Sequence, residues 1–237
     1  MSLTPPGYQT VQTEDGSVTF FSERFGEACH SPAGAKAETV LHYIEGCKIP
    51  EKALEKNVSI LEVGFGLGMG MLTTWERTKS LPAAIHFVSV EIDPELVKWF
   101  YEEHKNHPAL NDPKFSFEIL TGDARVTLPA YVKQYHPKWN AIYQDAFSPG
   151  RNPVLWTVEW FTLLRESSAD DVVLSTYSAS SSIRKSLVEA GWKLYPGEKF
   201  GQKRSSTRAK LTGMTDPEIL LNLERSPIKA LTDEPTP

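Results

Sequence analysis

One stretch decides the fold of this chain: Ile60-Leu61-Glu62-Val63-Gly64-Phe65-Gly66-Leu67-Gly68-Met69-Gly70. Residues 58–63 are mostly apolar, as in a short buried strand. Four alternating glycines follow, and a helical pattern begins near Met71. Glycine suits a backbone that turns sharply or lies against a ligand, because a Cβ would clash there. We therefore predict a ligand site at the carboxyl end of this strand, where open α/β sheets bind ligands.

The spacing of these glycines disfavours two common nucleotide-binding loops. A dinucleotide-binding loop has glycines at its first, third and sixth positions, but the sixth residue counted from Gly64 is Met69. No Gly-Lys-Ser/Thr follows, as a P-loop requires. An acid followed by alternating glycines resembles instead the first motif of class I S-adenosylmethionine (SAM) methyltransferases. That resemblance implies that Glu62 serves the positive groups of SAM; a turn without a ligand is the alternative.

Composition narrows the class of protein further. A chain of 237 residues accommodates one α/β domain with additions. The net charge of −5 gives no support to nucleic-acid binding and mildly opposes it, although a local basic patch is compatible with it. Cys29 and Cys47 form no metal-binding pair, so we expect reduced thiols, no metal and a cytoplasmic location. Neither a signal peptide nor a membrane span is evident in the sequence.

The first 56 residues form an addition that precedes the sheet. Asp15-Gly16 lies between two strand-like runs and predicts a hairpin. Ser31 and Pro32 predict the start of a helix, as its cap and its first turn. We expect this addition to be either a lid or substrate surface, or simply a packing extension.

Strands and helices alternate from Asn57 onward, which predicts a doubly wound, mostly parallel sheet. The strands after residues 58–63 are expected at 85–91, 115–120, 140–147, 172–177, 192–195 and 208–212. A short helix after Asp216 and a flexible, proline-rich tail from Ser226 would end the chain. We therefore divide the chain into residues 1–56, 57–213 and 214–237.

Acidic residues end three of the expected strands. Glu91 could accept hydrogen bonds from two ribose hydroxyls, which a charged acceptor makes strong, or could only cap the next helix. Asp123 could cap a helix, contact an adenine amino group, or do both. Asp145 precedes a loop that Pro149 and Pro153 make stiff, because proline fixes φ.

The Asp145 loop suits a site that methylates an amine. A carboxylate can orient the amine's lone pair, and such positioning lowers a barrier by about 7–11 kcal/mol. General-base help adds about 10²–10⁴ in rate. Phe147 and Trp156 could wall a flat, aromatic substrate. The alternative is that Asp145 only caps a helix that starts near Pro153.

Residues 199–204 are the densest basic run in the chain, with Arg208 and Lys210 close behind. The run is either a solvated loop or a contact for phosphate groups, in which case binding would weaken steeply with salt.

Three stretches together resemble the methyltransferase domain of the MnmC/MnmD family: Glu62-Val-Gly-Phe-Gly-Leu-Gly68, Asp145-Ala-Phe-Ser-Pro-Gly-Arg-Asn-Pro-Val-Leu-Trp156 and Phe200-Gly-Gln-Lys-Arg204. The resemblance covers about residues 8–213. It implies a class I, Rossmann-like fold with a seven-stranded sheet. It also implies SAM-dependent methylation of the aminomethyl group on the wobble uridine of tRNA.

The resemblance also assigns roles to single residues. It implies that SAM is bound by Glu62, Gly64, Phe65, Gly66, Gly68, Glu91, Asp123 and Ala124. It implies that Asp145 orients the substrate amine. It implies that the substrate is bound by Phe147, Pro149, Asn152, Pro153, Trp156, Lys203 and Arg204.

Two departures from the family pattern affect these expectations. Gly70 stands where the family often has Asn, which leaves the SAM geometry at this point open. The bifunctional members carry an FAD-dependent oxidase, and we expect a standalone form without oxidase or FAD, coupled to a separate modification enzyme. The alternatives are a methyltransferase or aminopropyltransferase-like enzyme for a small amine, and a SAM-binding module without catalysis.

Overall fold

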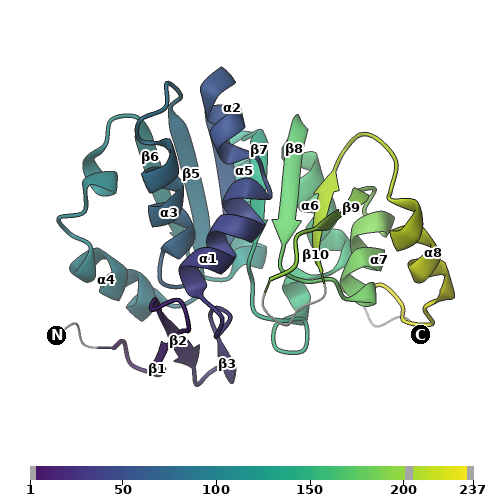
Figure 1. The fold of residues 1–237 in the computed structure, drawn as a ribbon, viewed down its shortest axis with the longest axis horizontal. Helices are drawn as coiled ribbons and strands as arrows, with labels where there is room; N and C mark the ends of the chain where they lie inside the picture. The colour runs from purple at the N-terminus through teal and green to yellow at the C-terminus, as the bar shows by residue number, and fades with distance from the viewer. Residues whose placement is uncertain (1–3, 201–204, 234–237) are drawn as a thin grey trace.

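The computed structural model describes residues 4–200 and 205–233 and has an α/β architecture (Figure 1). Its main sheet has seven strands in the order β6-β5-β4-β7-β8-β10-β9. The strands are β4 (Val58–Val63), β5 (Ile85–Glu91), β6 (Phe115–Thr121), β7 (Trp139–Gln144), β8 (Ser168–Thr176), β9 (Lys193–Gly197) and β10 (Ser206–Lys210). All neighbours pair in parallel except β10, which is antiparallel to β8 and β9. The predicted class I fold is confirmed.

Helices cover both faces of this sheet. They are α1 (Ala35–Thr39), the π-helix η1 (Val40–Glu45), α2 (Ile49–Glu55), α3 (Met69–Thr78), α4 (Pro94–Glu103), the 3₁₀ helices η2 (Pro108–Asn111) and η3 (Pro153–Leu155), α5 (Ala124–Tyr135), α6 (Val158–Glu166), α7 (Ser181–Glu189) and α8 (Pro217–Arg225). Side chains of η1, α2, α3 and α4 share one apolar core with the sheet, and those of α5 to α8 share the other. Within the described residues, every helix is too short or too polar to cross a membrane.

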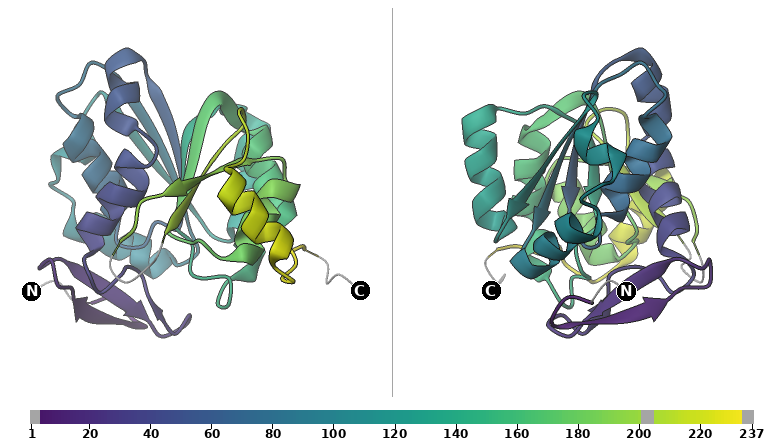
Figure 2. Two further views of the ribbon diagram at one scale, coloured as in Figure 1. Left: turned by 45° about the vertical axis from the view of Figure 1, so that its right-hand side comes forward. Right: turned by 90° about the vertical axis from the view of Figure 1, so that its left-hand side faces the viewer.

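A small antiparallel sheet lies below the carboxyl edge of the main sheet (Figure 2). It consists of β1 (Tyr8–Gln12), β2 (Val18–Ser22) and β3 (Glu27–Ala28). The hairpin predicted at Asp15-Gly16 is present as β1–β2, whereas β3 was not expected. Cys29 and Cys47 are both free thiols.

The helix predicted to start at Ser31 and Pro32 begins later, at Ala35. The Ser31 hydroxyl accepts a hydrogen bond from Ala33 N in the preceding turn instead. Asp15 of the β1–β2 hairpin, and not Ser31, accepts a hydrogen bond from the first turn of α1: Ala37 N donates to its carboxylate at 3.3 Å. A Cβ on Gly34 would lie 2.4 Å from the same carboxylate, so the close approach requires glycine there.

The expected flexible tail is wrong for residues 226–233. Val158 N donates to the Leu231 carbonyl at 2.8 Å, and Leu231 N donates to the Ser186 hydroxyl at 2.8 Å. Asp233 forms an ion pair with Arg125 and accepts a hydrogen bond from the Thr157 hydroxyl. This segment is therefore fixed against α6 and α7, which the low apolar content of the sequence did not suggest.

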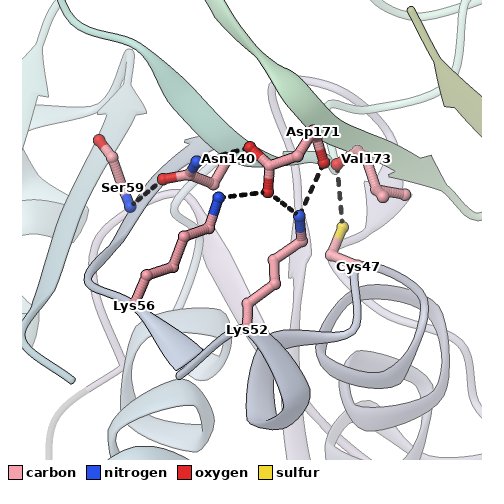
Figure 3. A network of polar contacts seen from close by, with 7 residues as sticks. All are labelled: Cys47, Lys52, Lys56, Ser59, Asn140, Asp171 and Val173. Carbon is pink, nitrogen blue, oxygen red and sulfur yellow. Dashed lines mark hydrogen bonds and ion pairs between the residues drawn. The ribbon is translucent and has the colours of Figure 1, made fainter. Parts of the chain in front are cut away.

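A polar network attaches α2 to the sheet (Figure 3). The Asp171 carboxylate accepts hydrogen bonds from Lys52 at 2.5 Å, Lys56 at 2.7 Å and Asn140 at 2.9 Å. Asn140 in turn accepts a hydrogen bond from Ser59 N. Burial alone would raise the pKa of Asp171, but these hydrogen bonds outweigh it and hold the pKa well below its usual value. The network holds α2 against β7 and β8.

Candidate active site

The glycine turn after β4 brings two strand ends together. Gly64, Gly66 and Gly68 all have positive φ, at 96°, 55° and 76°. A Cβ on Gly64 would lie 2.7 Å from the Asp145 carbonyl oxygen. A Cβ on Gly68 would lie 2.3 Å from the Phe100 ring, whereas one on Gly66 would meet nothing within 4 Å. Gly64 thus allows contact with the end of β7, and Gly66 leaves space beside the turn.

A cavity of about 380 Å³ opens beside this turn, between the main sheet and the N-terminal sheet. Gly64, Phe65 and Gly66 line it, but Gly68 does not. Its wall carries five carboxylates: Glu27, Glu38, Glu91, Asp123 and Asp145. The described residues in the wall include neither Lys nor Arg. His30, also in the wall, stays neutral because burial lowers its pKa to about 4. The cavity therefore favours positively charged ligands.

Glu91 faces the glycine turn from the end of β5. Its carboxylate accepts hydrogen bonds from Gly66 N and from Asp93 N, each at 3.0 Å. Asp93, and not Glu91, caps α4, because its carboxylate accepts from Glu95 N. Burial raises the pKa of Glu91, and the two backbone hydrogen bonds oppose that shift. The alternative in which Glu91 serves only as a helix cap is excluded.

Asp123 and Ala124 line the same cavity from the end of β6. The Asp123 carboxylate caps α5 by accepting a hydrogen bond from Arg125 N at 2.9 Å. Capping occupies one carboxylate oxygen, and the residue still borders the cavity. Both roles considered for Asp123 are thus compatible with the geometry.

Glu62 lies behind the turn and not in the cavity wall. The side chain is buried, and one carboxylate oxygen accepts a hydrogen bond from the Ser89 hydroxyl at 2.8 Å. The other oxygen lies 1.8 Å from where a Cβ on Gly70 would be. This close approach explains why glycine stands at position 70, since any side chain there would collide with Glu62 in its present position. Burial raises the pKa of Glu62 well above its usual value.

Glu62 predicts a pH dependence of stability. Its raised pKa means that the folded chain holds a proton that the unfolded chain releases, so stability falls as pH rises above about 4.5. Glu62→Gln removes this titration. We expect the melting temperature of the variant to exceed that of the parent at pH 8 and to fall less between pH 5 and pH 8. Thermal melts test this, with the exposed Glu55→Gln as control; parallel pH profiles for parent and Glu62→Gln would contradict it.

Asp145 stands at the junction of β7 with its loop. Its backbone N donates to the Val63 carbonyl at 2.9 Å, which continues the β4–β7 ladder. Its carboxylate accepts a hydrogen bond of 2.5 Å from the Tyr43 hydroxyl. The helix-cap alternative fails, because Asn152 precedes η3 and the Thr157 hydroxyl caps α6. The carboxylate lines the cavity and is held from the side by Tyr43.

Tyr43 belongs to the site although the sequence pattern does not indicate it. The residue lies on the π-helix η1, is buried, and packs its ring 5.3 Å from that of Tyr143. Burial, followed by the charge of Asp145, raises the pKa of Tyr43 well above its usual value, so its hydroxyl stays a donor. A π-helix changes which side chains share a face, so the spacing of residues in the sequence does not indicate that Tyr43 points toward Asp145.

The loop after Asp145 differs in part from the prediction. Phe147 and Asn152 line the cavity, but Pro149 and Pro153 do not. Trp156 is fully buried, and its indole N–H donates to the Phe147 carbonyl at 2.8 Å. The prediction that Trp156 walls the substrate is therefore wrong: its side chain supports the loop from the core. Lys203 and Arg204 lie outside the described residues.

The N-terminal addition forms part of the cavity wall. The sequence leaves open whether it is a substrate surface or only a packing extension. Tyr8, Phe25 and Cys29 line the cavity, together with the carboxylates of Glu27 and Glu38. The Glu38 carboxylate accepts a hydrogen bond from Ser31 N at 2.7 Å. The Tyr8 hydroxyl donates to Asp93 at 2.9 Å, which connects the small sheet to the start of α4. The addition therefore shapes the cavity as well as packing against the sheet.

Comparisons with known proteins agree with this geometry. Residues 91–212 match a family described as S-adenosyl-L-methionine-dependent methyltransferase. The bifunctional protein MnmC of Azoarcus sp. (strain BH72), named for tRNA 5-methylaminomethyl-2-thiouridine biosynthesis, is 30% identical over 90% of this chain and 36% of its own length. The protein of the same name from Paraburkholderia phymatum is 28% identical over 98% of this chain and 39% of its own. The chain thus spans under two-fifths of these relatives.

Solved structures support the same assignment. MNMC2 from Aquifex aeolicus superposes with a TM-score of 0.80 and 31% identity, covering 96% of this chain and 79% of that one. Human methyltransferase-like protein 13, solved with SAH, superposes with a TM-score of 0.52 at 14% identity over 79% of this chain and 85% of its own, and shares the fold. Together with the match over residues 91–212, these similarities show that the chain belongs to the MnmC-related family of S-adenosyl-L-methionine-dependent methyltransferases.

Proposed function

We propose that this chain transfers the methyl group of SAM to the aminomethyl group of 5-aminomethyl-(2-thio)uridine at the wobble position of tRNA. The names of the MnmC relatives support the substrate. The observation that carries the proposal is the Asp145 carboxylate, which borders the cavity next to the glycine turn and accepts a hydrogen bond from Tyr43. A fixed acceptor at this point suits a nucleophile that must lose a proton.

The cavity fits SAM in shape and in charge. Gly66 has no Cβ to fill the space beside the turn, and the acidic wall suits a ligand with ammonium and sulfonium groups. In this proposal Gly64, Phe65 and Gly66 hold the methionine part, and Glu91 holds the ribose. Asp123 and Ala124 border the adenine. When bound, SAM supplies an electrophilic methyl group on a positively charged sulfur.

The acidic wall disfavours the unprotonated amine that the reaction needs, and Asp145 offsets this effect. Nearby carboxylates raise the pKa of an amine and so favour its protonated, unreactive form. The Asp145 carboxylate accepts a hydrogen bond from the amine N–H and receives the proton that the amine loses. The nitrogen lone pair then forms the new N–C bond, while the electron pair of the broken C–S bond stays on sulfur. Positioning and general-base help are the two contributions of this residue.

The proposal also implies a second enzyme that acts on the same uridine and a cytoplasmic location. A separate enzyme would make or further process the modified uridine, because an aminomethyl group must be present before it can be methylated. A tRNA substrate would place the reaction in the cytoplasm. Methylation of a small-molecule amine would use the same Asp145 chemistry, but the names of the relatives favour tRNA.

The test is methyl transfer to tRNA. The chain is incubated with isotope-labelled SAM and bulk tRNA from cells that lack this activity, and the nucleosides are analysed by mass spectrometry. We expect a new labelled 5-methylaminomethyl-type wobble nucleoside, and a rate that falls steeply with salt. Unlabelled tRNA, with rapid and salt-independent methylation of small amines instead, would contradict the proposal.

A further inference from the structure

We infer that the mouth of the cavity is a nucleotide grip in which Phe25 and Phe147 receive a base turned out of the tRNA anticodon loop and Arg24 and Arg151 hold the phosphates beside it. We call these four residues the rim. The inference rests on the proposed function. It explains how a protein with a negative net charge binds an anionic substrate. The family resemblance assigns no individual role to Phe25, Arg24 or Arg151.

The two phenylalanines come from distant segments and form one aromatic wall. Their rings stack with centroids 4.4 Å apart and planes 22° apart. Both are half-buried and line the cavity. The Ser148 hydroxyl donates to the Glu27 carboxylate at 2.8 Å, which fixes the turn that carries Phe25 to the Asp145 loop. Flat bases that leave an RNA stack are held on such aromatic surfaces.

The two arginines lie beside this wall and are exposed. The guanidinium carbon of Arg24 is 5.3 Å from the centroid of the Phe25 ring. The guanidinium of Arg151 would lie 3.6 Å from a Cβ on Gly26, one residue after Phe25. No ion pair with a carboxylate engages either arginine within residues 4–200 and 205–233. Both guanidinium groups are therefore available to phosphate, which arginine binds through parallel hydrogen bonds.

The distribution of charge selects the orientation of the nucleotide. The interior wall holds five carboxylates and, among its described residues, no Lys or Arg, so it repels phosphate and attracts an amine. The rim holds two positive charges. An aminomethyl nucleotide therefore enters with its amine toward Asp145 and its phosphates at Arg24 and Arg151. This binding is compatible with the net charge of −5, because the positive groups are local to the mouth.

A polynucleotide fits the rim better than a free nucleoside. A nucleoside can use the aromatic wall but offers nothing to the arginines, whereas a nucleotide within a strand has a phosphate on each side. The two classes of contact predict different effects. Loss of an arginine should lower the preference for tRNA over nucleoside, and loss of the aromatic wall should affect both substrates.

The experiment compares kcat/KM for under-modified tRNA and for the free aminomethyluridine nucleoside in Arg24→Gln, Arg151→Gln and Phe25→Leu. Arg77→Gln is the matched control, because Arg77 is exposed at the end of α3, on the opposite edge of the sheet. We expect each rim arginine variant to lower the tRNA-to-nucleoside ratio by about tenfold, the size of a lost charged hydrogen bond. Each should also flatten the salt slope of tRNA binding by about 0.7.

The Phe25 variant tests the aromatic wall. Phe25→Leu keeps an apolar side chain but removes the ring, and we expect kcat/KM to fall by about tenfold or more for both substrates. SAM affinity and melting temperature, measured in parallel, report whether the variant folds.

The outcomes separate this inference from the proposed function. If the parent chain methylates tRNA but the salt slopes of both arginine variants equal that of Arg77→Gln, the rim does not hold phosphate and the inference is wrong. Equal losses for tRNA and nucleoside in the arginine variants would also contradict it, because they would indicate a role in shaping the loop. If the parent methylates only small amines, the proposed function itself fails.

Discussion

Replacing Asp145 with alanine is expected to lower kcat for methyl transfer by about 10²–10⁴-fold, the range of general acid–base catalysis. SAM should still bind, because Gly66 and Glu91, on the glycine turn and at the end of β5, remain in place. Asp145→Asn keeps the size of the side chain and an oxygen that accepts from the Tyr43 hydroxyl, but it removes the proton acceptor. We therefore expect Asp145→Asn to be nearly as slow as Asp145→Ala in single-turnover assays.

Tyr43 provides the graded variant for this prediction. Tyr43→Phe removes the 2.5 Å hydrogen bond to Asp145 and leaves the carboxylate in place. We expect a smaller loss of kcat than in Asp145→Ala, with little change in SAM affinity. Tyr135→Phe is the control, because Tyr135 is exposed on α5. An Asp145→Ala enzyme that retains more than a tenth of the parent kcat would contradict the catalytic role.

Alanine substitutions at two glycines of the turn are expected to affect different properties: stability at Gly64 and SAM binding at Gly66. At Gly64 the φ is 96° and the new Cβ would lie 2.7 Å from the Asp145 carbonyl oxygen. We expect Gly64→Ala to lower the free energy of unfolding by about 1–3 kcal/mol, the cost of a strained backbone. It should also displace Asp145 and so lower kcat.

At Gly66 the φ is 55°, in a region that other residues tolerate better, and the new Cβ would meet nothing within 4 Å. We expect Gly66→Ala to lower the melting temperature less than Gly64→Ala does, because it strains the backbone at positive φ without a clash. It should weaken SAM binding at least tenfold, because its methyl group enters the cavity. Calorimetric titration with SAM and thermal melts measure both properties. The pair would contradict the account if Gly66→Ala bound SAM as well as the parent or if Gly64→Ala melted at the parent temperature.

The main sheet could be predicted because the composition of several of its strands is recognisable in the sequence. Residues 58–63 and 85–91 are mostly apolar, as expected for parallel strands buried on both faces, and the structure has β4 and β5 at these bounds. The glycine spacing and the acids at strand ends were also sufficient to place Gly66, Glu91, Asp123 and Asp145 around one cavity.

Long-range contacts could not be predicted in the same way. Nothing local marks Tyr43 as the partner of a residue 102 positions later, or Phe25 as the neighbour of Phe147. The two errors at Ser31 and Trp156 have the same cause. A cap signal and an aromatic side chain were interpreted locally, but Asp15 bonds the first turn of α1 and the core encloses Trp156.

The most direct measurement of the account is a crystal structure of this chain with SAH and an anticodon stem-loop that carries 5-aminomethyluridine. We expect the amine nitrogen within about 3.2 Å of an Asp145 carboxylate oxygen. We also expect the SAH ribose to contact Glu91 and the uracil ring to lie against Phe147. An amine held elsewhere, with the Asp145 carboxylate turned away from it and from the sulfur, would contradict the central claim that the glycine turn and the Asp145 loop bring methyl donor and amine together.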